Sequence, residues 1–292
     1  MSLTSKRWIF ILEGILTVVV AIASFFVMYD YPGTAKFLNP AERMYVQNRL
    51  HVDNDGCSHE FKRKFVFDAF TDWKVWCFAI MFHGALCPVY TFSLFSPTLV
   101  ANLGYAAARA QLMSVPPYVA AAIVTLTVGY LSDKWQRRAP LVIGCSIMSG
   151  LGYGLLLADV TNGVNYFALF LAAMGVYPLV PIIVAWGSNN CGGSLKKGVA
   201  TAIVVSIGNL GGIVSSFIYP SADKPKYTKG HAVCLAYCAI TALCAVIMWV
   251  YAVAANKKRA ARNAARGRDW TPEEKKELED RGDHNDWFVY TI

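Results

Sequence analysis

Charged residues are scarce in this sequence of 292 residues: Asp, Glu, Lys and Arg make up 16% of it, whereas hydrophobic side chains make up 55%. This shortage of charge, with a mean hydropathy of +0.39, excludes an ordinary soluble protein and fits one that crosses a membrane several times. The charges that are present are concentrated between long apolar runs. Because lipid offers the backbone no hydrogen-bond partners, runs of this length without apolar–polar alternation predict membrane-spanning helices.

The sequence also lacks the residue patterns of catalytic and metal sites. No two carboxylates lie together inside an apolar run, no serine-nucleophile motif is present, and the eight cysteines do not have zinc-site spacing. Most of the cysteines lie inside the apolar runs, which indicates packing residues rather than a disulfide framework. We therefore predict that the protein is not an enzyme and uses no cofactor or metal.

The net charge of +8 does not indicate nucleic-acid binding, because the basic residues flank the apolar runs. They cluster at residues 62–64, 134–138, 196–197 and 257–259. Such clusters fix the orientation of a membrane protein and contact anionic headgroups. The expected partner of these charges is therefore the lipid bilayer, with no nucleic acid.

The apolar runs predict seven membrane-spanning helices, near residues 8–28, 74–99, 112–132, 139–158, 165–187, 198–218 and 231–254. The first run follows a charged start and so imitates a signal peptide. It is too long for one, Glu13 interrupts it, and no small-residue cleavage site follows it. The predicted fold class is therefore an all-α membrane protein.

The polar stretches define the other parts of the chain. Residues 1–28 carry the first span, and residues 29–73 form a linker in which Asn39-Pro40-Ala41-Glu42 predicts the start of a short surface helix. Residues 74–254 hold the other six spans. Residues 255–292 form a basic tail without a soluble catalytic domain.

A short charged turn separates the third and fourth predicted spans. Asp133 ends one helix, and Lys134, Arg137 and Arg138 precede the next. The cations alone predict only that the turn lies on the cytoplasmic side. Asp133 beside them, and Gly129 four residues earlier, favour a conformational latch, because a carboxylate can pair with cations and a glycine lets a neighbouring helix approach closely.

A cytoplasmic turn also fixes the predicted orientation. Because successive spans alternate, the linker, the loop at 188–197 and the tail then lie on the same side, and these are the basic segments. Lys224, Lys226, Lys229 and the N-terminal Lys6-Arg7 lie on the opposite side and weaken the rule. We expect a multi-pass protein of the plasma membrane with a cytoplasmic C-terminus.

Several strings in the chain carry a family resemblance. They are GYLSDKWQRR at 129–138, RWIFILEG at 7–14, TAKFL at 34–38, DWK at 72–74, YTFSLF at 90–95, AWGSNN at 185–190 and GNLGGI at 208–213. The first resembles the loop signature of the major facilitator superfamily, with Gln136 where that pattern often has glycine. Together the others resemble its fungal anion:cation symporter branch, the allantoate and nicotinate permease group.

The resemblance implies a fold and an activity. It aligns residues 7–28 with the sixth helix of the family and the rest with helices seven to twelve, so the fold is a C-terminal six-helix bundle with one preceding helix. Family members rock two halves around a midplane site. The implied activity is symport of a small organic anion such as nicotinate or allantoate, with a proton as coupling ion. Helices one to five are absent here, so the chain resembles a truncated permease whose missing half a partner would supply.

Polar side chains at membrane depth are costly and usually face a cavity or another helix. Their positions and the resemblance make nine residues candidates for substrate binding: His83, Tyr90, Phe92, Ser93, Tyr177, Trp186, Asn189, Asn190 and Asn209. No arginine lies in the middle of a span. The charge partner of an anionic substrate is therefore expected in the missing half.

On the second predicted span, His83 and the group around Tyr90 can each have either a functional or a purely structural role. His83 either exchanges a proton near neutral pH or is neutral and hydrogen-bonded to a neighbouring helix. Tyr90, with Phe92 and Ser93, either presents a ring and a hydroxyl to a planar anion or packs beside Pro88.

The asparagines are equally open to two interpretations. Asn209, flanked by glycines, either orients a carboxylate or joins two helices, and Asn189 and Asn190 either line an inner gate or bind the carbonyls at a helix end. For the whole chain, the competing hypothesis is a non-transporting membrane protein, either a degenerate fragment or an accessory subunit of a full-length carrier.

Overall fold

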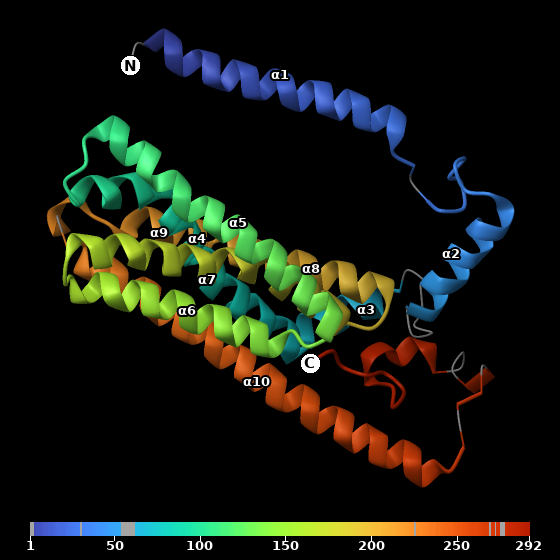
Figure 1. Ribbon diagram of the computed structural model, residues 1–292. Helices are drawn as coiled ribbons and strands as arrows, with labels where there is room; N and C mark the ends of the chain where they lie inside the picture. The colour runs from blue at the N-terminus through green and yellow to red at the C-terminus, as the bar shows by residue number, and fades with distance from the viewer. Residues whose placement is uncertain are drawn as a thin grey trace. The chain divides into compact units, whose positions relative to one another are not determined.

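A computed structural model describes residues 3–29, 31–53, 62–224, 226–268, 270–271, 273–274 and 278–292. The described residues form helices and connecting segments with no strand, which confirms the predicted all-α class (Figure 1). The chain divides into two units, Met1–Asp55 and Gly56–Ile292.

The first unit contains α1 (Leu3–Val27) and α2 (Pro40–Asp53). The described side chains of α1 are almost all exposed, including Phe25 and Phe26, so lipid or protein must cover this apolar helix. α2 begins where the sequence predicts. Asn39 Oδ1 accepts a hydrogen bond from the Glu42 amide at 2.9 Å, and a Glu42 carboxylate oxygen accepts one from the Asn39 amide at 3.0 Å, which is a capping box.

The second unit is a bundle of long helices (Figure 1). A short helix, α3 (Arg63–Thr71), precedes the bundle. The bundle helices are α4 (Trp73–Asn102), α5 (Ala107–Trp135), α6 (Ala139–Ala158), α7 (Asn162–Asn189), α8 (Ser194–Asn209), α9 (Gly211–Ile218) and α10 (Thr228–Arg266). Two short 3-10 helices, η1 (Ser221–Asp223) and η2 (Glu279–His284), follow α9 and α10.

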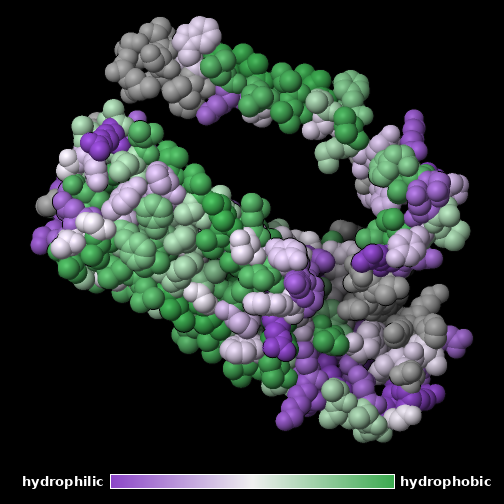
Figure 2. Space-filling model, viewed as in Figure 1, coloured by the Kyte–Doolittle hydropathy of each residue, from purple (hydrophilic) through white to green (hydrophobic). Residues whose placement is uncertain are grey.

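Six segments of this unit are long and apolar enough to cross a membrane: α4, α5, α6, α7, the pair α8 and α9, and α10. These confirm the predicted six-helix membrane bundle. The first predicted span corresponds to α1, whose described apolar part is the shorter Ile11–Val27. On the visible face of the second unit, hydrophobic residues cover the middle of the helices and hydrophilic residues gather toward both ends (Figure 2).

The two ends of the bundle differ in what they carry. The end with the α5–α6 turn, residues 136–138, is named the latch end. Residues 282–292, named the docked segment, lie there, because Ile292 accepts a hydrogen bond from the Arg138 amide. Lys74 at the start of α4 and Lys196 at the start of α8 also contact this segment. Within the second unit, the α5–α6 turn, the start of α8 and the docked segment, which alternation predicted to share a side, therefore lie at one end of the bundle.

Glycines bring α6 and α7 into backbone contact. A Cβ on Gly152 would lie 2.5 Å from the Ala172 amide nitrogen, and a Cβ on Gly175 would lie 2.6 Å from the Cys145 carbonyl oxygen. The glycine-rich sequence of α6 predicts such packing, and the structure shows it on one face of the helix. At Gly144 and Gly154 a Cβ would meet nothing within 4 Å, so no close approach occurs there.

The α5–α6 turn requires a left-handed residue. Gln136, the C-cap of α5, has φ 53° and ψ 24°, a conformation in which a side chain is unfavourable and glycine is favoured. This explains physically why a glycine suits this place in the turn. The Gln136 side chain compensates in part, because its Nε2 donates to the Asp133 carbonyl at 2.7 Å.

α10 is longer than the apolar run that it contains. The sequence predicts an end near residue 254, whereas the helix continues to Arg266 and ends at Gly267, which has φ 72°. The extension is rich in Ala, Lys and Arg, which favour helix without needing a membrane. It carries Asn256 and Arg259, which hold the docked segment.

Candidate functional site

Four of the predicted binding residues form two pairs between bundle helices. Tyr90 Oη on α4 donates to Asn209 Oδ1 on α8 at 2.5 Å, and Ser93 Oγ on α4 lies 2.9 Å from Tyr177 Oη on α7. All four side chains are at least partly exposed. The structure thus collects hydroxyl and amide groups from three helices within an otherwise apolar bundle.

An aromatic cluster backs the second pair. The Phe92 ring lies 5.4 Å from that of Tyr118 and 6.3 Å from that of Tyr177, and the Tyr118 and Tyr177 rings are 5.8 Å apart. Phe92 itself is 1% exposed, so it supports the other rings rather than facing an open space. The candidates predicted from the sequence do not include Tyr118, although a tyrosine directly after Pro116-Pro117 and within the apolar part of α5 was an available signal.

Asn209 joins two helices in this structure, as one of its two interpretations predicts. Besides accepting from Tyr90, its amide donates to the Val205 carbonyl at 2.7 Å. Contacts of Gly208 with the Phe82 ring and of Gly211 with the Cys87 backbone bring α8 and α9 close to α4 on either side of it. A role in orienting a carboxylate stays a prediction.

His83 faces the backbone of α8. Its Nδ1 lies 3.0 Å from the Ile207 carbonyl oxygen, which only accepts, so Nδ1 carries a hydrogen in this arrangement. The ring lies 5.5 Å from that of Tyr237. The interhelical hydrogen bond is therefore present, and proton exchange by His83 stays a prediction.

Trp186 and Asn190 lie at the latch end and bind the docked segment. Trp186 is fully buried and donates from Nε1 to the Thr291 carbonyl at 2.8 Å. Asn190 is buried as well, and its amide accepts from the Thr291 N–H at 2.8 Å and donates to the Thr291 carbonyl at 3.2 Å. The structure therefore separates these two residues from the Tyr90 and Ser93 pairs, and a gate-lining role stays a prediction.

In the predicted latch, only Arg138 is buried. Its guanidinium lies 3.7 Å from the exposed Asp133 carboxylate. With its amide oxygen turned toward Arg138, Asn189 accepts two hydrogen bonds of 3.1 Å from the same guanidinium. Burial lowers the pKa of Arg138, and Asp133 opposes this shift.

The other predicted latch residues make few contacts with the rest of the described bundle. Lys134 and Arg137 are exposed, and Lys134 Nζ lies 5.8 Å from the Tyr130 ring centre. A Cβ on Gly129 would meet nothing within 4 Å. The close helix approach expected at Gly129 is therefore not seen among the described residues, which leaves this face free for another surface.

The latch end also holds a buried group of four charged side chains that was not predicted from the sequence, named the lysine–aspartate cluster: Asp72, Lys74, Lys196 and Asp283. Lys196 Nζ lies 2.7 Å from Asp72 and 2.6 Å from Asp283, and Lys74 Nζ contacts both carboxylates. Burial by itself would raise the pKa of Asp283, but the two ammonium groups outweigh it and hold that pKa at about 2.

The same region offers oxygen and nitrogen donors, but its charge is already balanced. Ligand atoms of Asp72, Asp283 and His284 lie within 4.8 Å of one another. Because Lys74 and Lys196 already neutralise the two carboxylates, a cation would have to displace an ammonium group. No sequence signal points to the cluster, since Asp283 lies far along the chain from its partners.

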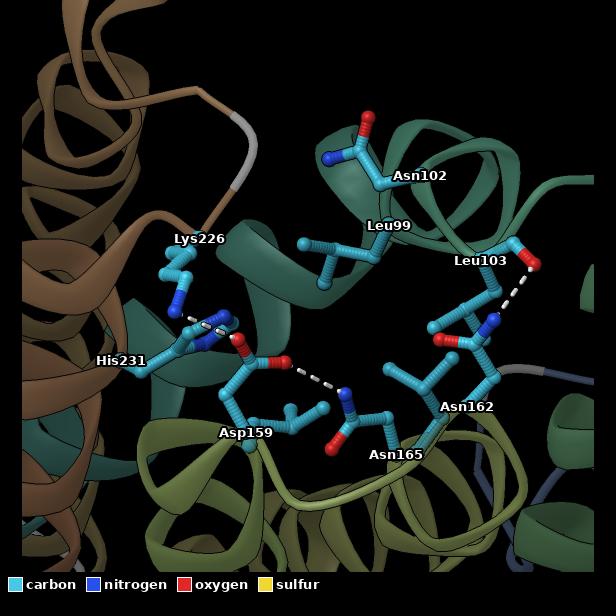
Figure 3. A pocket seen from close by; sticks show the side chains of 10 residues that line it. Leu99, Asn102, Leu103, Asp159, Asn162, Asn165, Lys226 and His231 are labelled. Atoms are coloured by element: carbon cyan, nitrogen blue, oxygen red, sulfur yellow. Dashed lines mark hydrogen bonds and ion pairs between the residues drawn. The ribbon is translucent and has the colours of Figure 1, made fainter.

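The opposite end of the bundle holds a polar cavity of about 230 Å³ (Figure 3). At its centre Asp159 accepts from Asn165 at 2.9 Å and pairs with Lys226 at 3.2 Å, and these contacts, the Asn165 bond foremost, lower its pKa. His231 lines the same cavity and its Nδ1 lies 2.8 Å from Tyr219 Oη. The cavity has room and partners for a small polar molecule entering from that end.

Comparisons with known proteins agree with this arrangement. The family model described as Major Facilitator Superfamily matches residues 1–216. The MFS-type transporter cnsO of Penicillium expansum is 34% identical over 98% of this chain and 58% of its own length. The High-affinity nicotinic acid transporter of Saccharomyces cerevisiae is 30% identical over 89% of this chain and 49% of its own, and the Major facilitator-type transporter hxnP of Emericella nidulans is 30% identical over 82% and 48%. The chain thus spans about half the length of the curated relatives that it matches.

Proposed function

The chain belongs to the major facilitator superfamily, and from this premise we propose that it supplies one half of a transporter rather than an enzyme. The proposed cargo is a small organic anion, nicotinate-like or allantoate-like, carried together with a proton by alternating access. Support for the cargo comes from the nicotinic acid transporter among the relatives. The second half would belong either to the same, longer chain or to a partner chain.

The observation that carries this proposal is the pair of interhelical contacts at Tyr90–Asn209 and Ser93–Tyr177. A carboxylate can accept from both tyrosine hydroxyls by replacing their contacts with Asn209 and Ser93, and from the second N–H of the Asn209 amide, whose first donates to Val205. The aromatic cluster beside them offers ring faces to a planar anion. No cation lies near these pairs in the described spans, so the anion's charge partner is assigned to the second half.

His83 is the proposed proton-exchanging group, because it is the one histidine of α4 and histidine is the side chain that titrates near neutral pH. It is half-buried, and breaking its bond to the Ile207 carbonyl would free the ring. The proposed location is the plasma membrane, with the latch end and the C-terminus in the cytoplasm. The basic residues at the latch end support that orientation.

Uptake of labelled nicotinate and allantoate tests the proposal in cells that make this chain alone or with a chain carrying the first half of a relative. Tyr90→Phe removes one hydrogen bond, worth about 1 kcal/mol, so uptake is expected to fall by roughly fivefold. Tyr130→Phe is the matched control, because Tyr130 is exposed near the latch end of α5. Uptake at the level of empty cells in both arrangements would contradict the proposed transport function. Normal uptake by Tyr90→Phe would contradict the proposed binding site.

A second candidate is an accessory protein that binds a full-length carrier without transporting. The open face of α5 at Gly129, where a Cβ would meet nothing within 4 Å among the described residues, favours this alternative because another protein could pack there. Co-purification of a longer relative with the tagged chain, together with no uptake by the chain in either arrangement, is the expected result for an accessory protein.

A further inference from the structure

The docked segment makes more specific contacts than a loosely attached tail would. Asp283, Asn285, Phe288 and Tyr290 are all buried against the latch end, each less than 5% exposed. The segment is not a continuation of α10, since Gly267 ends that helix. The docked segment therefore packs against the latch end as a segment separate from α10.

Two asparagines recognise consecutive peptide units of this strip. Asn256 on α10 accepts from the Tyr290 N–H at 2.9 Å and donates to the Tyr290 carbonyl at 2.8 Å. Asn190 at the end of α7 makes the same pair of bonds with Thr291. Each side-chain amide thus satisfies both backbone groups of one residue, which is how a groove holds an extended peptide.

Arg259 adds a third point of attachment. Its guanidinium donates to the Phe288 carbonyl at 2.7 Å and to the Asp283 carbonyl at 2.6 Å, and lies 4.4 Å from the Tyr290 ring centre. A cation over an aromatic ring with two charge-assisted hydrogen bonds is a strong, orientation-dependent contact.

The lysine–aspartate cluster is complete only with the segment in place. Asp72, Lys74 and Lys196 come from the bundle, and Asp283 comes from the segment. Without Asp283, two buried ammonium groups would share one carboxylate, which leaves a buried positive charge unbalanced. The bundle residues that contact the docked segment therefore favour a peptide with a carboxylate on the N-terminal side of its aromatic residues.

Gly192 lets the docked segment approach the α7–α8 loop closely. A Cβ there would overlap the Asp283 amide nitrogen and lie 2.6 Å from the Gly282 carbonyl carbon. The φ of Gly192 is not in the left-handed region, so an alanine would strain this contact and not the local backbone. By contrast, a Cβ on Gly198 in α8 would meet nothing within 4 Å.

We propose that the latch end is a peptide-binding groove, and that the docked segment is its detachable ligand, bound through Asp283 and the backbone of residues 290–291. Release uncovers Lys74, Lys196, Trp186 and Asn190 and frees the Arg138 amide at the α5–α6 turn. The groove does not depend on the proposed transport function, because every contact that defines it lies within this chain.

Cys191 provides a native reporter, because it directly precedes Gly192. Burial, with Asp283 as the next contribution, raises the pKa of its thiol to about 12, which keeps the reactive thiolate scarce at neutral pH. The experiment measures the rate of maleimide labelling of Cys191 in the purified full chain, by mass spectrometry of its peptides. The variants are Gly192→Ala and Asp283→Asn, with Gly198→Ala as the matched control.

If the docked segment is released in Gly192→Ala and Asp283→Asn, Cys191 is expected to be labelled about tenfold faster in these variants, with no change in Gly198→Ala. Cys234 and Cys238 are buried between helices and stay unlabelled unless the bundle unfolds. A synthetic peptide of residues 282–292 is expected to restore protection to Asp283→Asn, whereas the same peptide with Asp283→Asn is not. The proposal would be overturned if Cys191 were labelled in both variants at the same rate as in the wild type. It would also be overturned if neither peptide slowed the labelling of Asp283→Asn.

Discussion

At the scale of single residues, the latch end depends on charges that are buried and mutually compensated. Asp283 lies between two lysine ammonium groups, and Arg138 lies between Asn189 and the more distant Asp133. Buried charges of this kind do not need to add stability, but removing one partner leaves the others uncompensated. Their effect is therefore clearest in single substitutions and in the response to pH.

Asp283 predicts a loss of stability at acid pH. Its pKa in the folded protein is about 2, below the ordinary 3.8, so its stabilising contribution is complete above pH 3.8 and disappears as the pH falls toward 2. The shift corresponds to about 2 kcal/mol. Thermal unfolding of the purified chain, compared with Asp283→Asn at each pH, measures it.

The difference in melting temperature between the two proteins is expected to shrink as the pH falls through that window, because Asp283 of the wild type becomes protonated and neutral, like the Asn of the variant. At neutral pH the Asn variant is expected to be less stable by about 3 kcal/mol, the cost of breaking a buried ion pair. A difference that stays constant from neutral pH to about 2 would contradict this account of Asp283.

At the scale of helices, close packing is confined to particular faces. α6 contacts α7 through Gly152 and Gly175, whereas Gly144 and Gly154 on α6 face open space. In a membrane, where lipid competes for apolar surface, such backbone proximity supplies much of the attraction between helices. The two kinds of glycine in this pair of helices therefore have opposite responses to an added methyl group.

Gly175→Ala is expected to destabilise the bundle by about 1–3 kcal/mol, because its Cβ would overlap the α6 backbone at Ser149 and Cys145. Gly144→Ala adds the same methyl group in open space and is expected to cost nothing, or to stabilise by up to about 1 kcal/mol through higher helix propensity. Melting temperatures in one detergent compare the two variants. Equal effects of both substitutions would show that the α6–α7 contact is not tight.

At the scale of the whole molecule, the six spans of the second unit place chemically different residues at the two ends. The latch end gathers the α5–α6 turn, the lysine–aspartate cluster and the docked segment. The opposite end holds the Asp159 cavity and Lys226. An even number of spans separates Lys134 from Lys257, and an odd number separates Lys134 from Lys226.

Single cysteines at Lys134, Lys226 and Lys257 are therefore expected to report two faces of the membrane. All three lysines are exposed, so the substitutions leave the packing unchanged. A membrane-impermeant thiol reagent added to intact cells is expected to label the Lys226 position alone, and the other two only after the cells are opened. Labelling of the Lys134 and Lys257 positions from different faces would disprove the alternation of spans.

The sequence determined the membrane class, the six-span bundle and the grouping of its basic loops, because span length, apolar content and charge between spans are local properties. It also singled out the polar residues on α4, α7 and α8 as candidates, since a polar residue at membrane depth is conspicuous in an apolar run. Phe92, however, is buried behind Tyr118 and Tyr177, which local pattern alone does not reveal.

Only the tertiary structure decided which of these residues meet. The partners of Tyr90 and Ser93, the joining of Asp283 to Lys74 and Lys196, and the use of Trp186 and Asn190 as a seat for the docked segment each link parts of the chain that are far apart in sequence. Such pairings depend on how helices are rotated and staggered against one another. That arrangement follows from glycine contacts and buried charge balance across the whole bundle, which no single stretch of sequence contains.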